Sequence, residues 1–144
     1  MEVFFMTEYK LYDFLPEEAV KIRTEVFCEE QGFTEEFDSV DDSAVHVMAY
    51  YNGGPAATGR VFSDGNEKIR HIGRVAVKKR FRSLDIGTGV MLHLEAAARR
   101  QGAEYTELGA QCQAQGFYEK CGYIPCGEVF FEQNCPHIMM RKKL

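Results

Sequence analysis

A basic turn followed by two glycines at the start of a helix is the part of this sequence with the clearest chemical potential. The stretch reads VAVKKRFRSLDIGTG and covers residues 75–89. Four Lys and Arg side chains lie between residues 78 and 82, and the free backbone N–H groups of a helix start attract anions. Gly87 and Gly89 would let an anion approach the backbone closely. The turn is therefore typical of a site that holds phosphate groups.

Two common phosphate-binding motifs do not fit this turn. A P-loop needs Lys and then Ser or Thr directly after its last glycine, and the dinucleotide fingerprint needs a third glycine where this chain has Leu92. Asp85 also lies where an anion would bind, and aspartate is a preferred N-cap residue of helices. Taken alone, the turn leaves two interpretations open: a phosphate cradle, or an ordinary helix start capped by Asp85.

The elements that must position this turn follow from apolar periodicity and from Gly and Pro signals. In chain order we expect a strand at 8–14, a helix from Pro16 to Gly32, two strands within 44–62 around an Asn-Gly-Gly turn, a strand at 68–77, a helix from Asp85 to Gln101, a strand at 103–110, a short helix at 114–122, and strands at 123–131 and 137–144. The long helix connects strands 68–77 and 103–110, which should therefore be parallel. The predicted fold class is α/β, with a mixed sheet and helices on its faces.

Size and charge limit the classes of protein to consider. The chain has 144 residues, of which 45% are hydrophobic, so we expect one domain over residues 1–144 with a real core. The net charge of -5 argues against nucleic acid as a partner. No segment reaches the apolar length of a membrane span, and the N-terminus has no secretory pattern. We therefore expect a cytoplasmic protein without a membrane partner.

Five cysteines occur without a C-x-x-C pair, which fits neither a disulfide framework nor a zinc site. We expect free thiols and no metal. A catalytic cysteine stays open as an alternative, with Cys112 and Cys121 best placed, although no histidine lies in a recognisable partner motif.

Several segments together resemble a known family. The segment GRVAVKKRFRSLDIGTGVMLHLEAAARRQGAEYTEL resembles the acetyl-CoA-binding segment of the GNAT superfamily of N-acetyltransferases, whose signature is Q/R-x-x-G-x-G/A. Arg82 matches its first position and Gly87 its last, whereas Asp85 replaces the first glycine. The segments IRTEVFCEEQGF, AQCQAQGFYEKCGY and PHIMMRKKL also resemble the family, the last one its small-molecule subgroup, which includes glyphosate N-acetyltransferases. The resemblance spans nearly the whole chain.

The resemblance implies a fold and a cofactor site. The fold would be a mixed, largely antiparallel sheet of about seven strands, with one central parallel pair and helices on both faces. The backbone of Val75, Ala76 and Val77 would contact the pantetheine and thioester of acetyl-CoA, and an N–H donor there would stabilise the oxyanion. The residues implied for the pyrophosphate are Arg82, Ser83, Leu84, Asp85, Ile86, Gly87 and Thr88.

The resemblance also assigns two catalytic side chains. Tyr118 matches the tyrosine beside the CoA sulfur, where a phenol can donate a proton to the leaving thiolate. His137 matches the histidine that acts as general base toward the acceptor amine. Without the resemblance, Tyr118 would be a packed helix residue beside Phe117, and His137 a strand residue of no consequence.

The acceptor side is less defined by the sequence. Arg23, Arg60 and Arg74 could bind a carboxylate or phosphonate of the acceptor through their planar guanidinium groups. The resemblance matches Arg74 to an arginine that glyphosate-type enzymes use against their anionic substrate, with Gln111 in place of a second such arginine. Residues 29–42 include seven acids and no Lys or Arg, which indicates either steering of a cationic amine or a solvated loop. We expect a small primary amine as acceptor, an amino acid or another amine-bearing metabolite.

Two further functions stay open at this stage. The chain could be a CoA-responsive binding or regulatory module without turnover, or a transferase for protein lysines or N-termini. The exposed edge of an open sheet is compatible with a homodimer.

Overall fold

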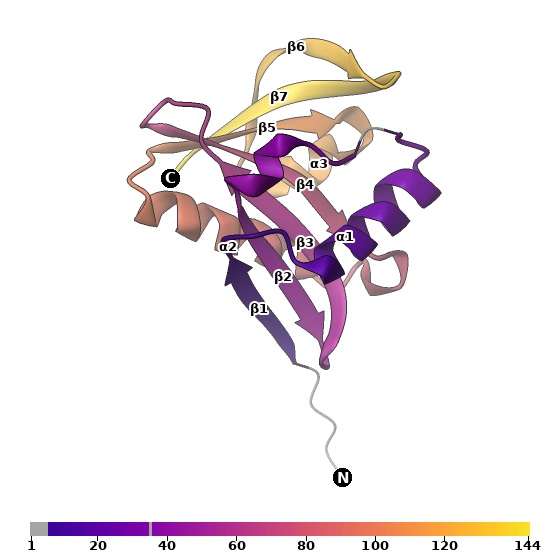
Figure 1. The fold of residues 1–144 in the computed structure, drawn as a ribbon. Coiled ribbons are helices and arrows are strands. Elements are labelled where there is room, and N and C mark those ends of the chain that lie inside the picture. The colour runs from indigo at the N-terminus through magenta and orange to yellow at the C-terminus, as the bar shows by residue number, and fades with distance from the viewer. Residues whose placement is uncertain (1–5, 35) are drawn as a thin grey trace.

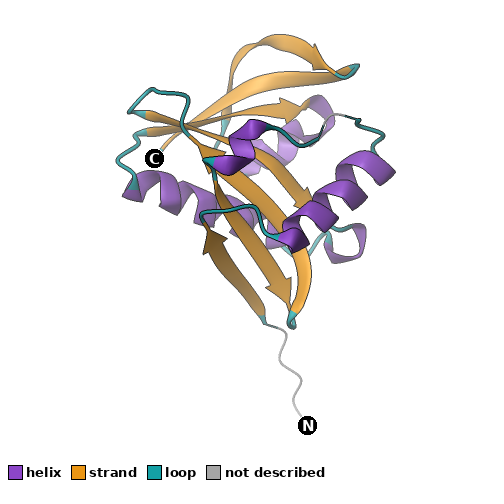
Figure 2. Cartoon of the chain, in the orientation of Figure 1, coloured by secondary structure: helices purple, strands orange, loops and turns teal. Residues whose placement is uncertain are grey.

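The computed structural model describes residues 6–34 and 36–144. They form a seven-stranded sheet in the order β1-β2-β3-β4-β5-β7-β6, with helices on both faces (Figures 1 and 2). Every neighbouring pair is antiparallel except β4 and β5, which are parallel. The predicted fold class and the predicted parallel pair are therefore confirmed. The elements are β1 Thr7–Tyr12, α1 Glu17–Arg23, β2 Val45–Tyr51, β3 Gly54–Phe62, β4 Ile69–Val77, α2 Ile86–Arg100, β5 Tyr105–Gln111, α3 Gln115–Lys120, β6 Ile124–Glu132 and β7 Cys135–Lys143.

The two faces of the sheet carry separate hydrophobic clusters. In β2 the side chains alternate, so Val47 and Ala49 belong to the cluster under α2 whereas Met48 packs with α1 on the opposite face. Gly59 of β3 lets α2 approach closely, because a Cβ atom there would lie 2.8 Å from Leu94 Cδ1. The core thus fixes α2, whose N-terminus follows the basic turn, against the centre of the sheet.

The first helix is shorter than its sequence pattern indicates. It ends at Arg23 and continues as a π-helical segment, Thr24–Glu30, before Gly32 turns the chain at φ +77°. The π-helical segment still buries Val26 and Phe27 on the core side. Wider turns of this kind are frequent at functional sites, and this one leads into the loop that contacts the site described below.

A buried polar network connects α2 to β5 and β7. Glu95 of α2 is 1% exposed and accepts hydrogen bonds from Tyr123 Oη at 2.9 Å and Lys142 Nζ at 2.9 Å. Tyr123 Oη also lies 2.7 Å from Thr106 Oγ1 of β5. A buried carboxylate is tolerated here because it has both a cation and a hydroxyl donor.

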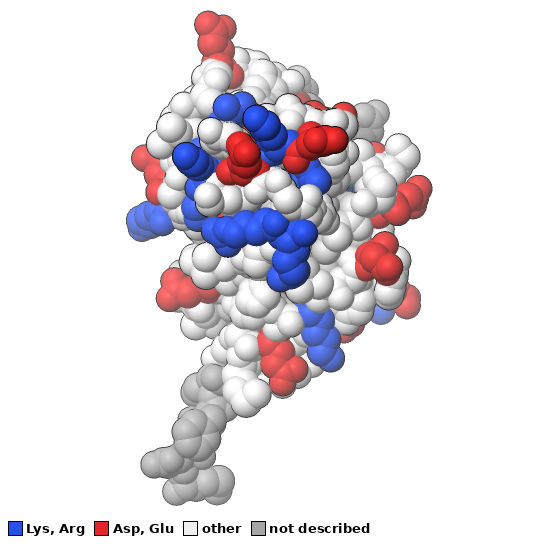
Figure 3. Space-filling model, turned by 90° about the vertical axis from the view of Figure 1, so that its left-hand side faces the viewer, with Lys and Arg blue, Asp and Glu red and all other residues white. Residues whose placement is uncertain are grey.

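The outer surface has mixed charge, and the sheet has two open edges. On the face drawn in Figure 3, Lys and Arg side chains are interspersed with Asp and Glu. The edge strand β6 exposes Ile124, Val129 and Phe131, while the homodimer stays a prediction. No helix in the described ranges is long and apolar enough to span a membrane.

Candidate active site

The centre of the sheet is open where β4 and β5 diverge. The two strands pair only at Ile69–His71 with Tyr105–Glu107, so residues 72–77 of β4 have no strand partner on the β5 side. A register shift between Thr58 and Arg60 of β3 adds a bulge, and Arg74 there has φ +53°. This divergence leaves backbone groups of β4 free to bind an extended ligand.

A cavity of about 1170 Å³ lies at this divergence. It is lined by residues of β3, β4, β5, α3, β6 and β7, of the π-helical segment and of the loop after it. Tyr118, His137, Arg74, Gln111 and Val75, all predicted site residues, line this one cavity. Its volume slightly exceeds the usual range for a single small ligand.

The basic turn has an unusual backbone conformation. Ser83 and Asp85 have φ values of +67° and +60°, in the left-handed region that Asp tolerates better than most residues. Asp85 is exposed, and no side-chain cap hydrogen bond to α2 is found among the described residues. Asp85 therefore occupies the N-cap position of α2, but in a left-handed conformation and without the side-chain hydrogen bond of an ordinary N-cap.

Gly89 does not serve the role expected from the sequence. A Cβ atom there would lie 1.9 Å from Tyr9 Oη, so the ring of Tyr9 fills the space beside it. That ring stacks on His93 at 4.3 Å. At Gly87 a Cβ atom would lie 3.2 Å from Phe117 Cζ of α3. Gly89 therefore admits a core tyrosine rather than an anion, and Gly87 permits the approach of α3.

Arg82 already has a carboxylate partner in this structure. Its guanidinium binds both oxygens of Glu30 at 2.7 Å, and its Nε donates to the Val77 carbonyl at 3.0 Å. The Glu30 hydrogen bonds raise the pKa of Arg82 above its ordinary value. Arg82 thus connects the turn to the end of β4 and to the π-helical segment.

Tyr118 contributes a buried phenol to the lining of the cavity. It lies on α3, and its ring contacts the rings of Phe117 and Tyr123 edge to face, at centroid distances of 5.0 and 6.2 Å. Burial, together with the neighbouring Cys121, raises the pKa of the Tyr118 phenol well above its ordinary value. The phenol therefore carries its proton at neutral pH and can donate it into the cavity.

His137 contributes an imidazole ring, held by a hydrogen bond at Nδ1, to the lining of the cavity. It lies on β7 opposite Gln111 of β5, and its ring stacks on Phe130 at 5.6 Å. Its Nδ1 lies 2.8 Å from the Cys135 carbonyl, which can only accept a hydrogen bond, so the proton of the neutral ring is on Nδ1. The lone pair of Nε2 is then available, with Glu132 Oε2 3.9 Å away.

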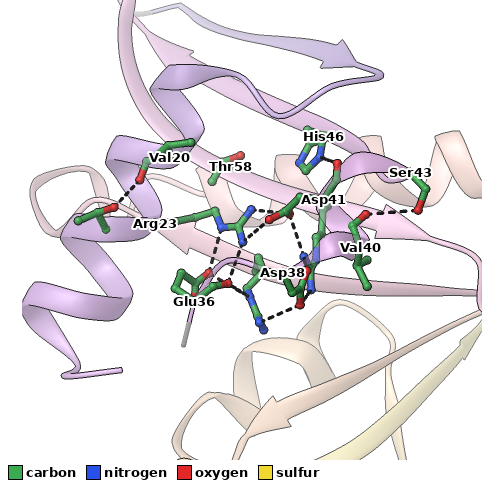
Figure 4. Close-up of polar contacts among 12 residues, drawn as sticks. Val20, Arg23, Glu36, Asp38, Val40, Asp41, Ser43, His46 and Thr58 are labelled. Atoms are coloured by element: carbon green, nitrogen blue, oxygen red, sulfur yellow. Dashed lines mark hydrogen bonds and ion pairs between the residues drawn. The ribbon is translucent and has the colours of Figure 1, made fainter. Parts of the chain in front are cut away.

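The three candidate acceptor-binding arginines form ion pairs with the acidic run (Figure 4). Arg23 binds Glu36 and Asp41, with Nε to Oε1 at 3.0 Å and Nη1 to Oδ1 at 2.8 Å. Since Arg23 is 1% exposed, it has no access to a substrate. The expectation that Arg23 binds the acceptor is corrected: Arg23 is a buried structural cation.

Arg60 and Arg74 both bind Asp38, and each also binds one of the two carboxylates that pair with Arg23. Arg60 Nη1 lies 2.7 Å from Asp38 Oδ1 and 2.8 Å from Asp41 Oδ1. Arg74 Nε lies 3.0 Å from Glu36 Oε1, and its Nη2 lies 3.5 Å from Asp38 Oδ2. The hydrogen bonds from Arg60 lower the pKa of Asp38, whereas burial raises the pKa of Glu36. Glu36 and Asp41 are buried, so this part of the acidic run is not a solvated loop.

Other polar side chains complete the cavity. Gln111 Nε2 donates to Gln31 Oε1 at 2.9 Å, which connects β5 to the end of the π-helical segment. Thr34 donates to Gln133 Oε1 from its backbone N–H at 2.8 Å, so the loop contacts the β6–β7 turn. Burial raises the pKa of the Cys121 thiol, which disfavours its thiolate. Within the described ranges, no group of three His, Cys, Asp or Glu residues could hold a metal ion.

Sequence reasoning missed several residues that line the cavity, among them Phe33, Phe37, Glu36, Asp38 and Phe130. The acidic run was noticed, but nothing in its spacing indicates which arginines its members contact. Phe130 could have been inferred only from the register of β6 with β7, which places it opposite His137.

Comparisons with known proteins define the class of this chain. The family model described as "Acetyltransferase (GNAT) domain" matches residues 12–144. The Bacillus subtilis (strain 168) protein YjcF, described as an uncharacterized N-acetyltransferase, is 36% identical over 129 residues, 87% of this chain and 90% of its own length. The chain therefore belongs to the GNAT family of acetyltransferases.

Solved structures share this fold. The crystal structure of Escherichia coli ElaA superimposes with a TM-score of 0.84 at 28% identity, over 96% of this chain and 100% of ElaA. A GNAT acetyltransferase from Elizabethkingia anophelis with acetyl-CoA bound has a TM-score of 0.75 at 14% identity, over 96% of this chain and 98% of that one. The second likeness concerns the fold alone.

Proposed function

We propose that this protein is an acetyl-CoA-dependent N-acetyltransferase that acetylates the primary amine of a small molecule by direct nucleophilic attack. The observation that carries the proposal is the cavity at the divergence of β4 and β5, because a protonated phenol and a free imidazole nitrogen both line it. Family membership supports transferase chemistry, and the unpaired edge of β4 fits an extended pantetheine chain.

In this mechanism acetyl-CoA supplies an activated acetyl thioester, and the side chains manage the protons. His137 Nε2 accepts the proton that the amine loses as its nitrogen bonds to the thioester carbon. Backbone N–H groups among Val75, Ala76 and Val77 donate to the oxyanion. Tyr118 donates its proton to the thiolate when the carbon–sulfur bond breaks. No acyl-enzyme forms, which agrees with the raised pKa of Cys121.

The turn at residues 82–88 would hold the pyrophosphate of CoA, by the backbone N–H groups at the start of α2. Arg82, Ser83, Leu84, Asp85, Ile86, Gly87 and Thr88 remain the proposed contacts. The left-handed conformation of Asp85 favours this role, because it avoids the N-cap geometry that would use these N–H groups.

The first test is thermal unfolding with acetyl-CoA, with desulfo-CoA and with ATP as a control. A ligand that binds only the native state stabilises it by about 2.7 kcal/mol at a hundredfold excess over its dissociation constant. We expect a shift that is selective for the CoA compounds, followed by acetylation in a panel of small amines. No shift with either CoA compound at millimolar concentration would contradict the proposal.

One observation favours a second candidate, a CoA-responsive module without turnover. Asp85 places a carboxylate beside the proposed pyrophosphate site, which favours a site adapted to sensing rather than to tight cofactor use. Tight CoA binding without acetylation of small amines, or of peptide lysines and N-termini assayed beside them, would support this candidate. Acetylation of the peptides alone would indicate a protein acetyltransferase.

A further inference from the structure

The charge balance of the cavity defines which acceptors it can bind, and this inference rests on the proposed function. The lysine and arginine side chains that line the cavity are Arg60 and Arg74. Arg60 is paired with Asp38 and Asp41, and Arg74 with Glu36 and Asp38. A carboxylate entering from solvent would therefore compete with the resident carboxylates for the charge of either arginine. Among the described residues, the buried Arg60 Nε has no hydrogen-bond partner.

The reactive end of the cavity is also unfavourable for an anion. Glu132 Oε2 lies 3.9 Å from His137 Nε2, the proposed proton acceptor, and the Glu132 side chain is 61% exposed. In an α-amino acid the carboxylate is attached to the carbon that bears the amine. That carboxylate would lie close to Glu132, whereas an ammonium arriving alone would be attracted to it.

Aromatic side chains supply the remaining recognition surface. Phe27 and Phe33 lie edge to face at 6.3 Å, and the Arg23 guanidinium lies 4.7 Å from the centre of the Phe37 ring. Phe130 of β6 stacks on His137 at 5.6 Å. All four phenylalanines line the cavity. Rings placed around one cavity favour a flat or apolar ligand body.

We propose that the acceptor is an arylalkylamine or a similar apolar primary amine without an anionic group, rather than an amino acid. The aromatic side chains bind its body, Glu132 attracts its ammonium, and His137 removes the proton during the reaction. The arginines that would otherwise favour an anionic acceptor are neutralised by the acidic run.

The experiment compares phenethylamine with L-phenylalanine, two amines that differ only in the carboxylate. Binding is measured by calorimetry on the full chain, alone and saturated with desulfo-CoA, and turnover is measured with acetyl-CoA. We expect phenethylamine to bind about tenfold more tightly or better, with a similar ratio in kcat/KM. Equal or tighter binding of phenylalanine, or no binding of either amine, would overturn the inference.

A second pair of ligands tests the aromatic surface. Phenethylamine should bind about tenfold more tightly than ethylamine, because the ring buries apolar area that ethylamine lacks. Equal binding of these two amines would overturn the role given to the phenylalanines. If phenethylamine binds selectively but is never acetylated, the proposed function fails while the inference about which amines the cavity binds stands.

A charge-matched pair of variants tests the neutralised arginines directly. Asp38→Asn removes the carboxylate that Arg60 and Arg74 share, and the Asp38 side chain is 40% exposed, so the variant should fold. We expect the preference for phenethylamine over phenylalanine to fall about threefold or more. Asp42→Asn removes the same charge from the same turn, and Asp42 makes none of the ion pairs found among the described residues; its preference should stay as in the wild type. An unchanged preference in a folded Asp38→Asn variant would contradict the proposal.

Discussion

The proposed cofactor-binding segment and the acceptor side of the cavity are built in different ways. The proposed cofactor side uses backbone: an unpaired edge of β4, and a turn in which Ser83 and Asp85 take left-handed conformations. The acceptor side uses side chains, Arg60 and Arg74 together with the acids that pair with them, from segments that are distant in the chain. Backbone groups bind what all acetyl-CoA-dependent enzymes share, whereas side chains can change from one acceptor to another at little cost to the fold.

The largest expected effect comes from removing the side chains that we propose as proton acceptor and proton donor. We expect His137→Ala to lower kcat by about 10² to 10⁴, since this is the usual contribution of a general base, and Tyr118→Phe to lower it less if another donor can reach the thiolate. Both variants should keep wild-type affinity for desulfo-CoA, measured by calorimetry. Full turnover in both variants on a verified amine would show that the assigned mechanism is wrong.

A substitution at Gly89 tests whether the start of α2 depends on the close approach of the Tyr9 ring to the helix backbone. Gly89→Ala places a methyl group where Tyr9 Oη now lies, 1.9 Å from the new atom, so the Tyr9 ring must leave its contact with His93. We expect a loss of about 1–3 kcal/mol of unfolding free energy, as for other overpacked sites. Gly116→Ala is the matched control, because a Cβ atom there meets nothing within 4 Å. Urea unfolding of the two variants measures the difference, and equal stability would refute this account of Gly89.

Lowering the pH should reduce the unfolding free energy through His46, which contacts the acidic run. Burial lowers the pKa of His46, whose Nε2 lies 2.9 Å from the Asp41 carbonyl. The unfolded chain then binds a proton near pH 6.5 that the folded chain still excludes, so the contribution of His46 is full above that pH and declines as pH falls toward the lowered pKa. One proton limits this slope to about 1.4 kcal/mol for each pH unit.

The comparison variant for this pH dependence is His46→Gln, which cannot titrate. The stability difference between wild type and variant should shrink between pH 7 and pH 5, in chemical unfolding at each pH. A difference that stays constant with pH would mean that His46 does not exclude the proton.

The smallest effect concerns the charge at the proposed pyrophosphate site. Asp85→Asn keeps a residue type that tolerates the left-handed conformation and removes only the charge. We expect desulfo-CoA to bind a few times more tightly at low salt, with the gain decreasing at higher salt because of screening. Unchanged affinity at every salt concentration would place Asp85 away from the phosphates.

Sequence patterns determined the order of elements, the parallel pair β4–β5 and the family, because these depend on local periodicity, on the length of the crossover helix and on short motifs. They also selected Tyr118 and His137, which the fold brings to one cavity. The π-helical continuation of α1 was missed, since its apolar spacing differs little from that of an ordinary helix.

Only the tertiary structure decided the partners of the charged residues. Arg23, Arg60 and Arg74 looked available for a ligand, and the acidic run looked solvated, because a sequence shows charge but not distance. Folding places Glu36, Asp38 and Asp41 within ion-pair distance of those arginines, and burying the arginines without these partners would cost too much free energy. Whether a pyrophosphate can bind beside Asp85 likewise depends on the backbone conformation of this residue, φ +60°, which no residue pattern reveals.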